Sequence, residues 1–196
     1  MKTAVLVSGS GTNLQALLDA QVAPATIELV VSSKKDALAL KRAQDAGVKA
    51  ITLSPKDYSD RQSYDEAILN ALKQHHIDFI VLAGFMRILG PDFIKHYENK
   101  IINTHPALLP SFPGLHGARQ ALEYGSKITG CTVHVVDAGV DTGPIVFQSA
   151  VDVLESDDEK SLQRRIQAEE HKLLPKALQM FASDKFSVKD RRVTAR

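Results

Sequence analysis

The sequence predicts a single α/β domain with an open, mostly parallel twisted sheet, flanking helices and an antiparallel element in its C-terminal half. In the first half of the chain, short runs rich in β-branched residues alternate with longer segments of helical period. Later, two β-rich runs are separated only by a turn, so no crossover helix can join them. The 196 residues, 44% of them hydrophobic, suffice for one well-filled core and are few for two domains of ordinary size.

The first half of the chain predicts five strands joined by four crossover helices. Parallel neighbours need such crossovers, which is why this alternation indicates a parallel sheet. Pro91 begins the fourth helix, at a position where a missing amide hydrogen costs nothing. The predicted strands are 2–7, 27–31, 49–53, 79–82 and 100–103, and the helices between them are 13–20, 37–46, 61–75 and 91–97.

After Asn103 the pattern changes to a loop with three prolines and then a short helix, 117–124. Strands 129–136 and 145–153 follow on either side of the turn DAGVDTG, and their close linkage predicts antiparallel neighbours. A long helix, 161–183, comes next. The basic tail KDRRVTAR is expected to fray.

Charge and cysteine content exclude several classes of function. The 24 basic and 23 acidic side chains leave a net charge of +1, so no global field attracts nucleic acid or an anionic membrane. Cys131 is the single cysteine, which excludes an internal disulfide and fits a reducing cytosol. No apolar stretch approaches the ~20 residues that span a bilayer. We expect a cytoplasmic protein, a monomer or weak homodimer, that acts on small molecules.

The N-terminal segment VLVSGSGTNLQALL is typical of a strand, a glycine turn and a helix. Such a turn points backbone N–H groups and the positive end of a helix dipole at one place, where anions bind. We predict a phosphate held by Gly11, Thr12 and Asn13; the alternative is a tight turn in which Thr12 or Asn13 caps the helix. NAD is disfavoured, because the third glycine of the dinucleotide fingerprint and the ribose-binding acid are both missing.

Polar side chains follow the strand at 100–103, at the edge of the sheet where α/β proteins bind ligands. Asn103 and His105 project to the same side of an extended chain, and the prolines beyond them stiffen the loop. An amide donor beside an imidazole suits an oxyanion that develops next to an amine losing its proton. The alternative, in which Asn103 only caps a structural element and His105 is a half-buried structural residue, is equally supported by this segment alone. Asp141 in GVDTG would favour the charged imidazole, although an Asp between glycines is more often only a turn residue.

Two further segments predict ligand contacts. Helical projection of 161–183 places Glu170 near the middle of the apolar arc and Gln167 towards its edge. A buried carboxylate needs a partner, so Glu170 is a candidate ligand-binding group, unless a kink at Pro175 turns it to solvent. The loop LAGFMRILG, with apolar side chains around Arg87, suits a flat aromatic ligand; core packing under the loop is the alternative. The remaining histidines, His134 among them, show no metal-site spacing.

Taken together, six segments resemble the phosphoribosylglycinamide formyltransferases. They are SGSGTNLQALL, LAGFMRIL, INTHPALLPSFPGLHG, GCTVHVVD, VDTGPI and QAEEHKLLP, in the family's order and over nearly the whole chain. The resemblance implies a Rossmann-like formyltransferase fold: one domain, 1–196, with a nucleotide-binding-like half at 1–103, a catalytic and folate half at 104–183 and a tail at 184–196. It also implies formyl transfer from 10-formyltetrahydrofolate to the amine of glycinamide ribonucleotide in de novo purine biosynthesis, without a metal.

The resemblance also assigns roles to individual residues. The catalytic roles fall on Asn103, His105 and Asp141. The ribonucleotide contacts fall on Gly11, Thr12, Asn13, Gln167 and Glu170. The folate contacts fall on Arg61, Met86, Arg87, Ile88, Leu89, Asn103, Asp137, Ala138, Gly139, Val140 and Asp141. We expect Asn103 and a protonated His105 to hydrogen-bond the tetrahedral oxyanion, with Asp141 raising the pKa of His105.

Other folate enzymes resemble the same central segments. A methionyl-tRNA formyltransferase is expected to carry a further C-terminal domain and a basic RNA surface, and a formyltetrahydrofolate hydrolase an additional N-terminal domain. This chain begins at the glycine loop and stops at Arg196, which favours the ribonucleotide enzyme. A non-enzymatic nucleotide-binding module is the remaining alternative. It gives no reason for Asn103, His105 and Asp141 to meet, so their separation in space would favour it.

Overall fold

A twisted sheet of nine strands runs through the structure, a computed structural model that describes residues 1–184 and 186–195. The strand order is β3-β2-β1-β4-β5-β6-β7-β9-β8. The strands are β1 Lys2–Val7, β2 Thr26–Ser32, β3 Lys49–Thr52, β4 Phe79–Leu82, β5 Ile101–His105, β6 Ile128–Val135, β7 Ile145–Asp152, β8 Phe186–Lys189 and β9 Arg192–Ala195. The helices are α1 Thr12–Ala20, α2 Leu38–Asp45, α3 Arg61–Gln74, α4 Pro91–His96, α5 Gly117–Tyr124 and α6 Glu159–Ala182, with a 3₁₀ turn at Pro55–Asp57.

The predicted fold class is confirmed. Strands β1 to β5 pair in parallel, each joined to the next by a segment that contains a helix. Strand β6 is antiparallel to both β5 and β7, as the short connection between β6 and β7 requires. Among the described residues, no helix combines the length and the apolar character needed to cross a membrane.

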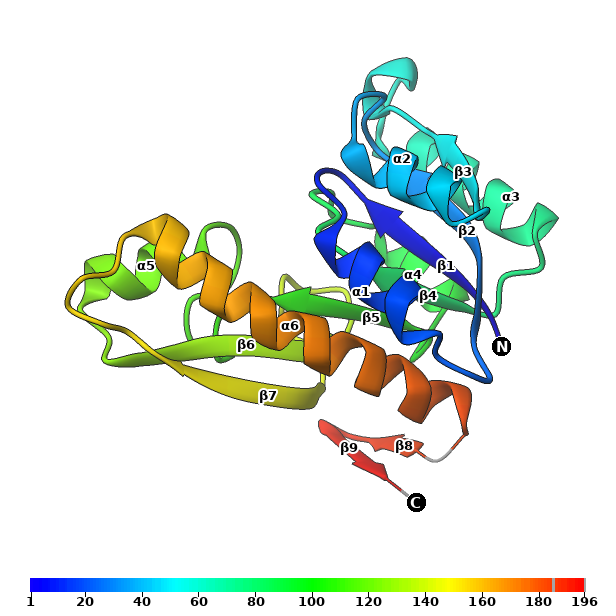
Figure 1. Cartoon of the computed structure of the whole chain (residues 1–196). Helices are drawn as coiled ribbons and strands as arrows, with labels where there is room; N and C mark the ends of the chain where they lie inside the picture. Colours follow the sequence, from blue (N-terminus) through cyan, green and yellow to red (C-terminus); the bar gives the residue numbers. More distant parts are fainter. Residues whose placement is uncertain (185, 196) are drawn as a thin grey trace.

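Helices cover both faces of the sheet, and the strands are hydrophobic on both faces for that reason. On one face Val5, Val30 and Val81 pack against α1, α2 and α6. On the other face Leu6 and Ile80 pack against α3 and α4. Figure 1 shows α6 running beside α1 and along β6 and β7, so α6 ties the two halves of the sheet together.

Two elements extend beyond their predicted ends for identifiable reasons. Helix α6 begins two residues earlier than the predicted 161–183, because the Asp158 side chain accepts a hydrogen bond from the Ser161 N–H in a capping box. Strand β5 continues past Asn103, because β6 pairs with it as far as His105 opposite Thr132. His105 therefore lies on a rigid strand and not in the proline loop.

The prediction that the basic tail frays is wrong for its described residues. Strands β8 and β9 form an antiparallel hairpin, and β9 joins β7 at the edge of the sheet (Figure 1). Val188 and Val193 pack against the core, and the ring of Phe186 lies 4.2 Å from that of Phe181. The apolar side chains that lie between the charged residues of the tail thus attach it to the core. Arg196 lies outside the described residues.

The order of the strands sets the place of a ligand site. From β1 the chain moves outward to β2 and β3, then returns to β4 on the other side of β1 and continues to β5. Loops that leave β1 and β4 therefore diverge, and an open crevice forms outside their carboxyl ends. The segments after β1, β4 and β5 are the glycine loop, LAGFMRILG and the proline loop.

Candidate active site

A cavity of about 450 Å³ lies at the carboxyl ends of β4 and β5, within the size range of small-molecule sites. Its walls come from the end of β5, the loop at 84–89, residues 114–116 and the turn at 136–141, together with His134. Asn103, His105 and Asp141 all line it. The three predicted catalytic residues therefore meet in one space, and the alternative that depends on their separation is disfavoured.

His105 is held between two acceptors. Its Nδ1 lies 3.3 Å from the Asp141 carboxylate, and its Nε2 lies 2.7 Å from the carbonyl oxygen of Phe112. The Gly114 N–H donates to the same Asp141 oxygen at 2.8 Å. Because a carbonyl can only accept, Nε2 carries a hydrogen, and Nδ1 is the atom that gains or loses a proton. The proline loop, through Phe112 and Gly114, thus fixes both members of the pair.

His134 is a site residue that the sequence interpretation left out. Its Nε2 lies 3.2 Å from the Asn103 amide nitrogen and 3.5 Å from Asp141, and its Nδ1 lies 3.0 Å from the Val135 carbonyl. That carbonyl needs a donor, so Nδ1 carries the hydrogen and Nε2 accepts from Asn103. The amide of Asn103 is thereby oriented, and its second N–H remains for a ligand. Antiparallel pairing places Asn103 directly opposite His134.

The expectation of a protonated His105 needs correction. Burial lowers the pKa of His105 below its usual value of 6.5, and this effect outweighs the Asp141 carboxylate and the Phe112 carbonyl, which raise it. The His105 side chain is 4% exposed, so water solvates its charged form poorly. For Asp141, burial raises the pKa, but the nearby His134 ring, the hydrogen bond from the Gly114 N–H and the nearby His105 ring lower it overall. At pH 7 the pair is therefore a neutral imidazole beside a carboxylate.

Glu170 lies behind β5, because alternate residues of a strand face opposite ways. Asn103 and His105 face the cavity, whereas the Thr104 hydroxyl donates to Glu170 Oε1 at 3.1 Å and the Asn13 amide donates to Oε2 at 3.2 Å. Glu170 is 4% exposed, so the alternative in which a kink turns it to solvent is wrong. Burial raises the pKa of Glu170, and its two hydrogen bonds only partly offset this effect.

Replacing Glu170 with glutamine is expected to raise the free energy of unfolding at pH 8. The folded-state pKa is raised above 4.5, so ionising Glu170 destabilises the fold. The destabilisation is absent below the unfolded pKa, grows as the pH rises to the folded pKa and is then constant. Chemical denaturation of both proteins at pH 8 and pH 4 measures this difference, which should nearly vanish at pH 4.

The matched control is Glu169→Gln on the same helix. Hydrogen bonds from Lys172 and Ser149 lower the pKa of Glu169, so its stabilising contribution is present above the unfolded pKa and is lost as the pH falls. This variant should therefore be no more stable than the parent at pH 8. Destabilisation of Glu170→Gln that is larger at pH 8 than at pH 4 would instead mean that the ionised carboxylate stabilises the fold.

The glycine loop forms the start of α1. Gly11 has φ +72°, and a Cβ there would lie 2.6 Å from the Ala39 side chain, so only glycine fits. No side chain caps the start of α1, so the alternative in which Thr12 or Asn13 caps the helix is disfavoured. The N–H groups of the first turn therefore remain available to an anion. The Asn13 amide nitrogen is committed to Glu170, whereas its Oδ1 is buried without a partner among the described residues. Gln167 is half-buried one turn before Glu170.

The loop after β4 gives the cavity its apolar wall. Met86 and Ile88 are 61% and 62% exposed and line the cavity beside Arg87. Leu89 is 5% exposed and belongs mainly to the core under α3. For this residue, the alternative that the loop LAGFMRILG packs on the core holds. The Met86 N–H donates to the Ser8 hydroxyl at 2.9 Å, which ties this loop to the end of β1.

Asp65 anchors the far end of the same loop, a role that the sequence interpretation missed. Its carboxylate accepts from the Gly90 N–H at 2.7 Å, and a Cβ at Gly90 would lie 2.8 Å from that oxygen. Burial raises the pKa of Asp65, while the Gly90 bond and Arg61 lower it in part. Arg61 lies near Gly90 but is not among the residues that line the cavity.

The turn after β6 closes the cavity opposite the apolar loop. Asp137 accepts hydrogen bonds from the Gly139 N–H and the Thr142 hydroxyl, at 3.1 and 2.6 Å. Asp137, Gly139, Val140 and Asp141 line the cavity, whereas Ala138 does not. Asp141 has φ +54°, a conformation that Asp and Asn tolerate better than other side chains. In the described part of the chain, no cluster of three His, Cys, Asp or Glu side chains is arranged to hold a metal ion.

Several known proteins resemble this chain in sequence and in fold. A phosphoribosylglycinamide formyltransferase of Mycobacterium tuberculosis is 46% identical over 192 residues, 97% of this chain and 89% of that protein. The Drosophila melanogaster trifunctional purine biosynthetic protein adenosine-3 is 48% identical over 187 residues, which cover 93% of this chain but only 14% of that protein. The crystal structure of glycinamide ribonucleotide transformylase 1 from Symbiobacterium toebii is 46% identical. It superimposes with a TM-score of 0.97, covering 100% of this chain and 93% of that one.

The family model described as formyl transferase matches residues 1–178, which include every element from β1 to most of α6. That stretch contains the glycine loop, the cavity, the Asn103, His105, His134 and Asp141 cluster, and Glu170. On this match and on the close relatives, the chain belongs to the formyl transferase family.

Proposed function

We propose that the chain transfers the formyl group of 10-formyltetrahydrofolate to the amine of glycinamide ribonucleotide, giving formylglycinamide ribonucleotide and tetrahydrofolate. The observation that carries this proposal is the meeting of Asn103, His105, His134 and Asp141 in one cavity. An amide donor and a proton acceptor are the two groups that formyl transfer to an amine requires. The names of the relatives specify the acceptor.

The surroundings of this cluster fit the two substrates. The exposed side chains of Met86, Ile88 and Val140 offer apolar contact to a flat pterin ring, and the backbone of the turn at 137–141 offers polar groups to its edge. On the other side of β5, the uncapped start of α1 suits the phosphate of the ribonucleotide. Glu170 keeps unused acceptor capacity for ribose hydroxyls, because each of its carboxyl oxygens receives only one hydrogen bond, from Asn13 or from Thr104.

The carbon–nitrogen bond forms when the amine attacks the formyl carbon of the bound donor. Holding both substrates in one crevice makes this step effectively intramolecular. The carbonyl oxygen becomes an oxyanion, and the Asn103 N–H that His134 does not use is the donor we assign to it. Asn103 is oriented before the substrates bind, so little reorganisation is needed as charge develops.

The proton of the attacking amine has to reach the folate nitrogen that leaves. Because burial keeps His105 neutral at pH 7, we assign the His105–Asp141 pair the role of base. The Asp141 carboxylate then stabilises the imidazolium. As the oxyanion collapses, the bond to the folate nitrogen breaks and that nitrogen takes the proton. The pair returns to its starting state, and neither a covalent enzyme intermediate nor Cys131 takes part.

The test mixes the purified chain with 10-formyltetrahydrofolate and follows tetrahydrofolate with and without glycinamide ribonucleotide. Formation that depends on the ribonucleotide, with formylglycinamide ribonucleotide as the second product, supports the proposal. Equal formation without the acceptor would identify a formyltetrahydrofolate hydrolase instead. Absence of product in both mixtures, with a correctly folded chain, would favour a binding module.

A further inference from the structure

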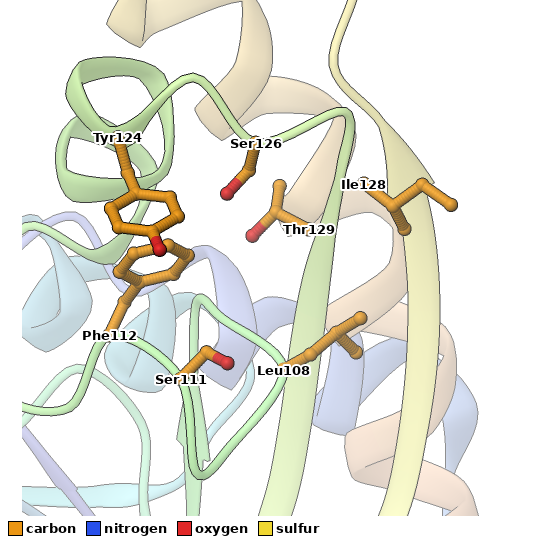
Figure 2. Close-up of a pocket in the computed structure, with 7 residues that line it drawn as sticks. All are labelled: Leu108, Ser111, Phe112, Tyr124, Ser126, Ile128 and Thr129. Atoms are coloured by element: carbon orange, nitrogen blue, oxygen red, sulfur yellow. The ribbon is translucent and has the colours of Figure 1, made fainter.

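A second cavity, of about 330 Å³, lies behind the proline loop, between residues 108–112, the end of α5 and the start of β6. Figure 2 shows the seven side chains that line it. We propose that this second cavity binds a small neutral aromatic molecule with one hydrogen-bonding group, and that its occupant acts on His105 through Phe112. Apart from Phe112, whose carbonyl holds His105, none of the residues to which we assign a role in formyl transfer lines this cavity.

The polar part of the second cavity favours a hydrogen-bonding occupant. Thr129 is 1% exposed, and its hydroxyl has no partner among the described protein groups. In Figure 2 this hydroxyl points into the cavity, and the hydroxyls of Ser111 and Ser126 face the same space. A buried hydroxyl left without a partner is costly. A ligand hydroxyl or carbonyl placed among these groups would remove that cost.

The other lining residues favour a flat, uncharged ligand. The rings of Phe112 and Tyr124 lie edge to face, with centroids 5.8 Å apart and planes at 64°, so an inserted ring meets aromatic surface. Leu108 and Ile128 supply apolar side chains to the lining. No charged side chain is among the lining residues, all of which the structure describes. An anion or cation would thus lose its hydration without gaining a partner.

Phe112 connects the second cavity to the active site. Its ring lines the second cavity, and its carbonyl accepts the hydrogen bond from His105 Nε2 at 2.7 Å. Its φ of +55° is uncommon for a residue other than glycine, so the surrounding contacts hold this backbone in place. An occupant that moves the Phe112 ring therefore changes the acceptor that helps to hold His105.

The experiment titrates the ¹⁵N-labelled protein with 2-naphthol, a neutral two-ring alcohol, and follows the backbone amides by NMR. We expect saturable shifts at Phe112, Ser126 and Thr129. We also expect the NMR titration of the His105 imidazole to move to a different pH when the cavity is filled. The shape-matched anion 2-naphthoate should bind at least tenfold more weakly. These measurements need no formyl transfer, so they remain valid if the proposed function fails.

Two variants test the contacts separately. Thr129→Val keeps the shape of the side chain, removes only an unpaired hydroxyl, and should weaken 2-naphthol about 2- to 10-fold. Tyr124→Ala, at a side chain that is 81% exposed, should fold normally and weaken it by a similar factor. Thr26→Val, at the exposed start of β2, is the matched control and should bind normally.

Several results would overturn the proposal. These are the absence of saturable shifts at the three amides, equal binding by Thr129→Val and the parent, and equal binding of naphthoate and naphthol. An unchanged His105 titration in the saturated protein would overturn the link through Phe112. Soaked crystals that show only a water molecule beside Thr129 would overturn the choice of ligand.

Discussion

Replacing Asn103 with alanine is expected to lower kcat about 10²–10³-fold, the usual loss when one oxyanion donor is removed. The Asn103 amide has one N–H committed to His134 and one directed to the space where the oxyanion develops. The ground-state carbonyl carries less charge than the oxyanion, so the KM of both substrates should change far less than kcat. Steady-state kinetics with each substrate varied in turn measures both quantities.

The matched control is Asn70→Ala, an exposed asparagine on α3, which should keep the parental kcat. A loss in Asn103→Ala that appears only in KM would move Asn103 from oxyanion stabilisation to substrate binding. A loss below about tenfold would leave the oxyanion without its assigned donor.

His134 is expected to act through Asn103, and the double variant tests this dependence. In His134→Ala the Asn103 amide loses the acceptor that orients it, so kcat should fall, but less than in Asn103→Ala. Once Asn103 is alanine, His134 has no amide to orient. The double variant should therefore match Asn103→Ala, because residues that act as a unit are not additive. Losses that add in full would give His134 a separate role.

Strand parity explains why the sequence predicted the Asn103–His105 pair but not His134, the partner of Asn103. Residues at positions i and i+2 of a strand project to the same face, whatever the rest of the fold is. By contrast, the pairing of Asn103 with His134 depends on the antiparallel register of β5 and β6, which lie far apart in sequence. Tertiary packing sets that register. Thr104 was missed for a related reason: the sequence does not reveal that α6 covers the face opposite Asn103.

The buried position of Asp65 could have been predicted from the sequence. The projection that placed Glu170 on the apolar face of α6 also places Asp65 with Ile68 and Leu72 on the buried face of α3. A carboxylate there requires a partner, which the structure supplies as the Gly90 N–H. The identity of that partner was not predictable, because the loop after β4 has no periodic pattern.

The charge state of His105 marks the limit of reasoning from residue types. Asp141 does act in the predicted direction, raising the pKa of His105. The sequence gives no measure of burial, however, and at 3% exposure desolvation exceeds the effect of the carboxylate. The choice between an imidazolium donor and a neutral base thus depends on packing, which only the structure supplies.

Replacing Asp141 with asparagine is expected to have the largest effect, a fall in kcat of about 10²–10⁴-fold. Asparagine tolerates the φ of +54° and can accept the Gly114 hydrogen bond, so the turn should persist while the charge is lost. Without the carboxylate, only burial and the Phe112 carbonyl act strongly on His105, and its pKa falls further. The imidazolium formed during transfer is then less stable, so turnover falls more than substrate affinity.

The pH profile distinguishes this role from a structural one. A base is inactive when protonated, so kcat of the parent should fall as the pH drops through the pKa of His105, below 6.5. In Asp141→Asn that acidic limb should move to lower pH, whereas Asp152→Asn, at the exposed end of β7, should leave it in place. NMR titration of the imidazole measures the same shift directly. An acidic limb that moves to higher pH, or a near-normal kcat, would remove Asp141 from the catalytic pair, since neither result is compatible with a carboxylate that stabilises the imidazolium.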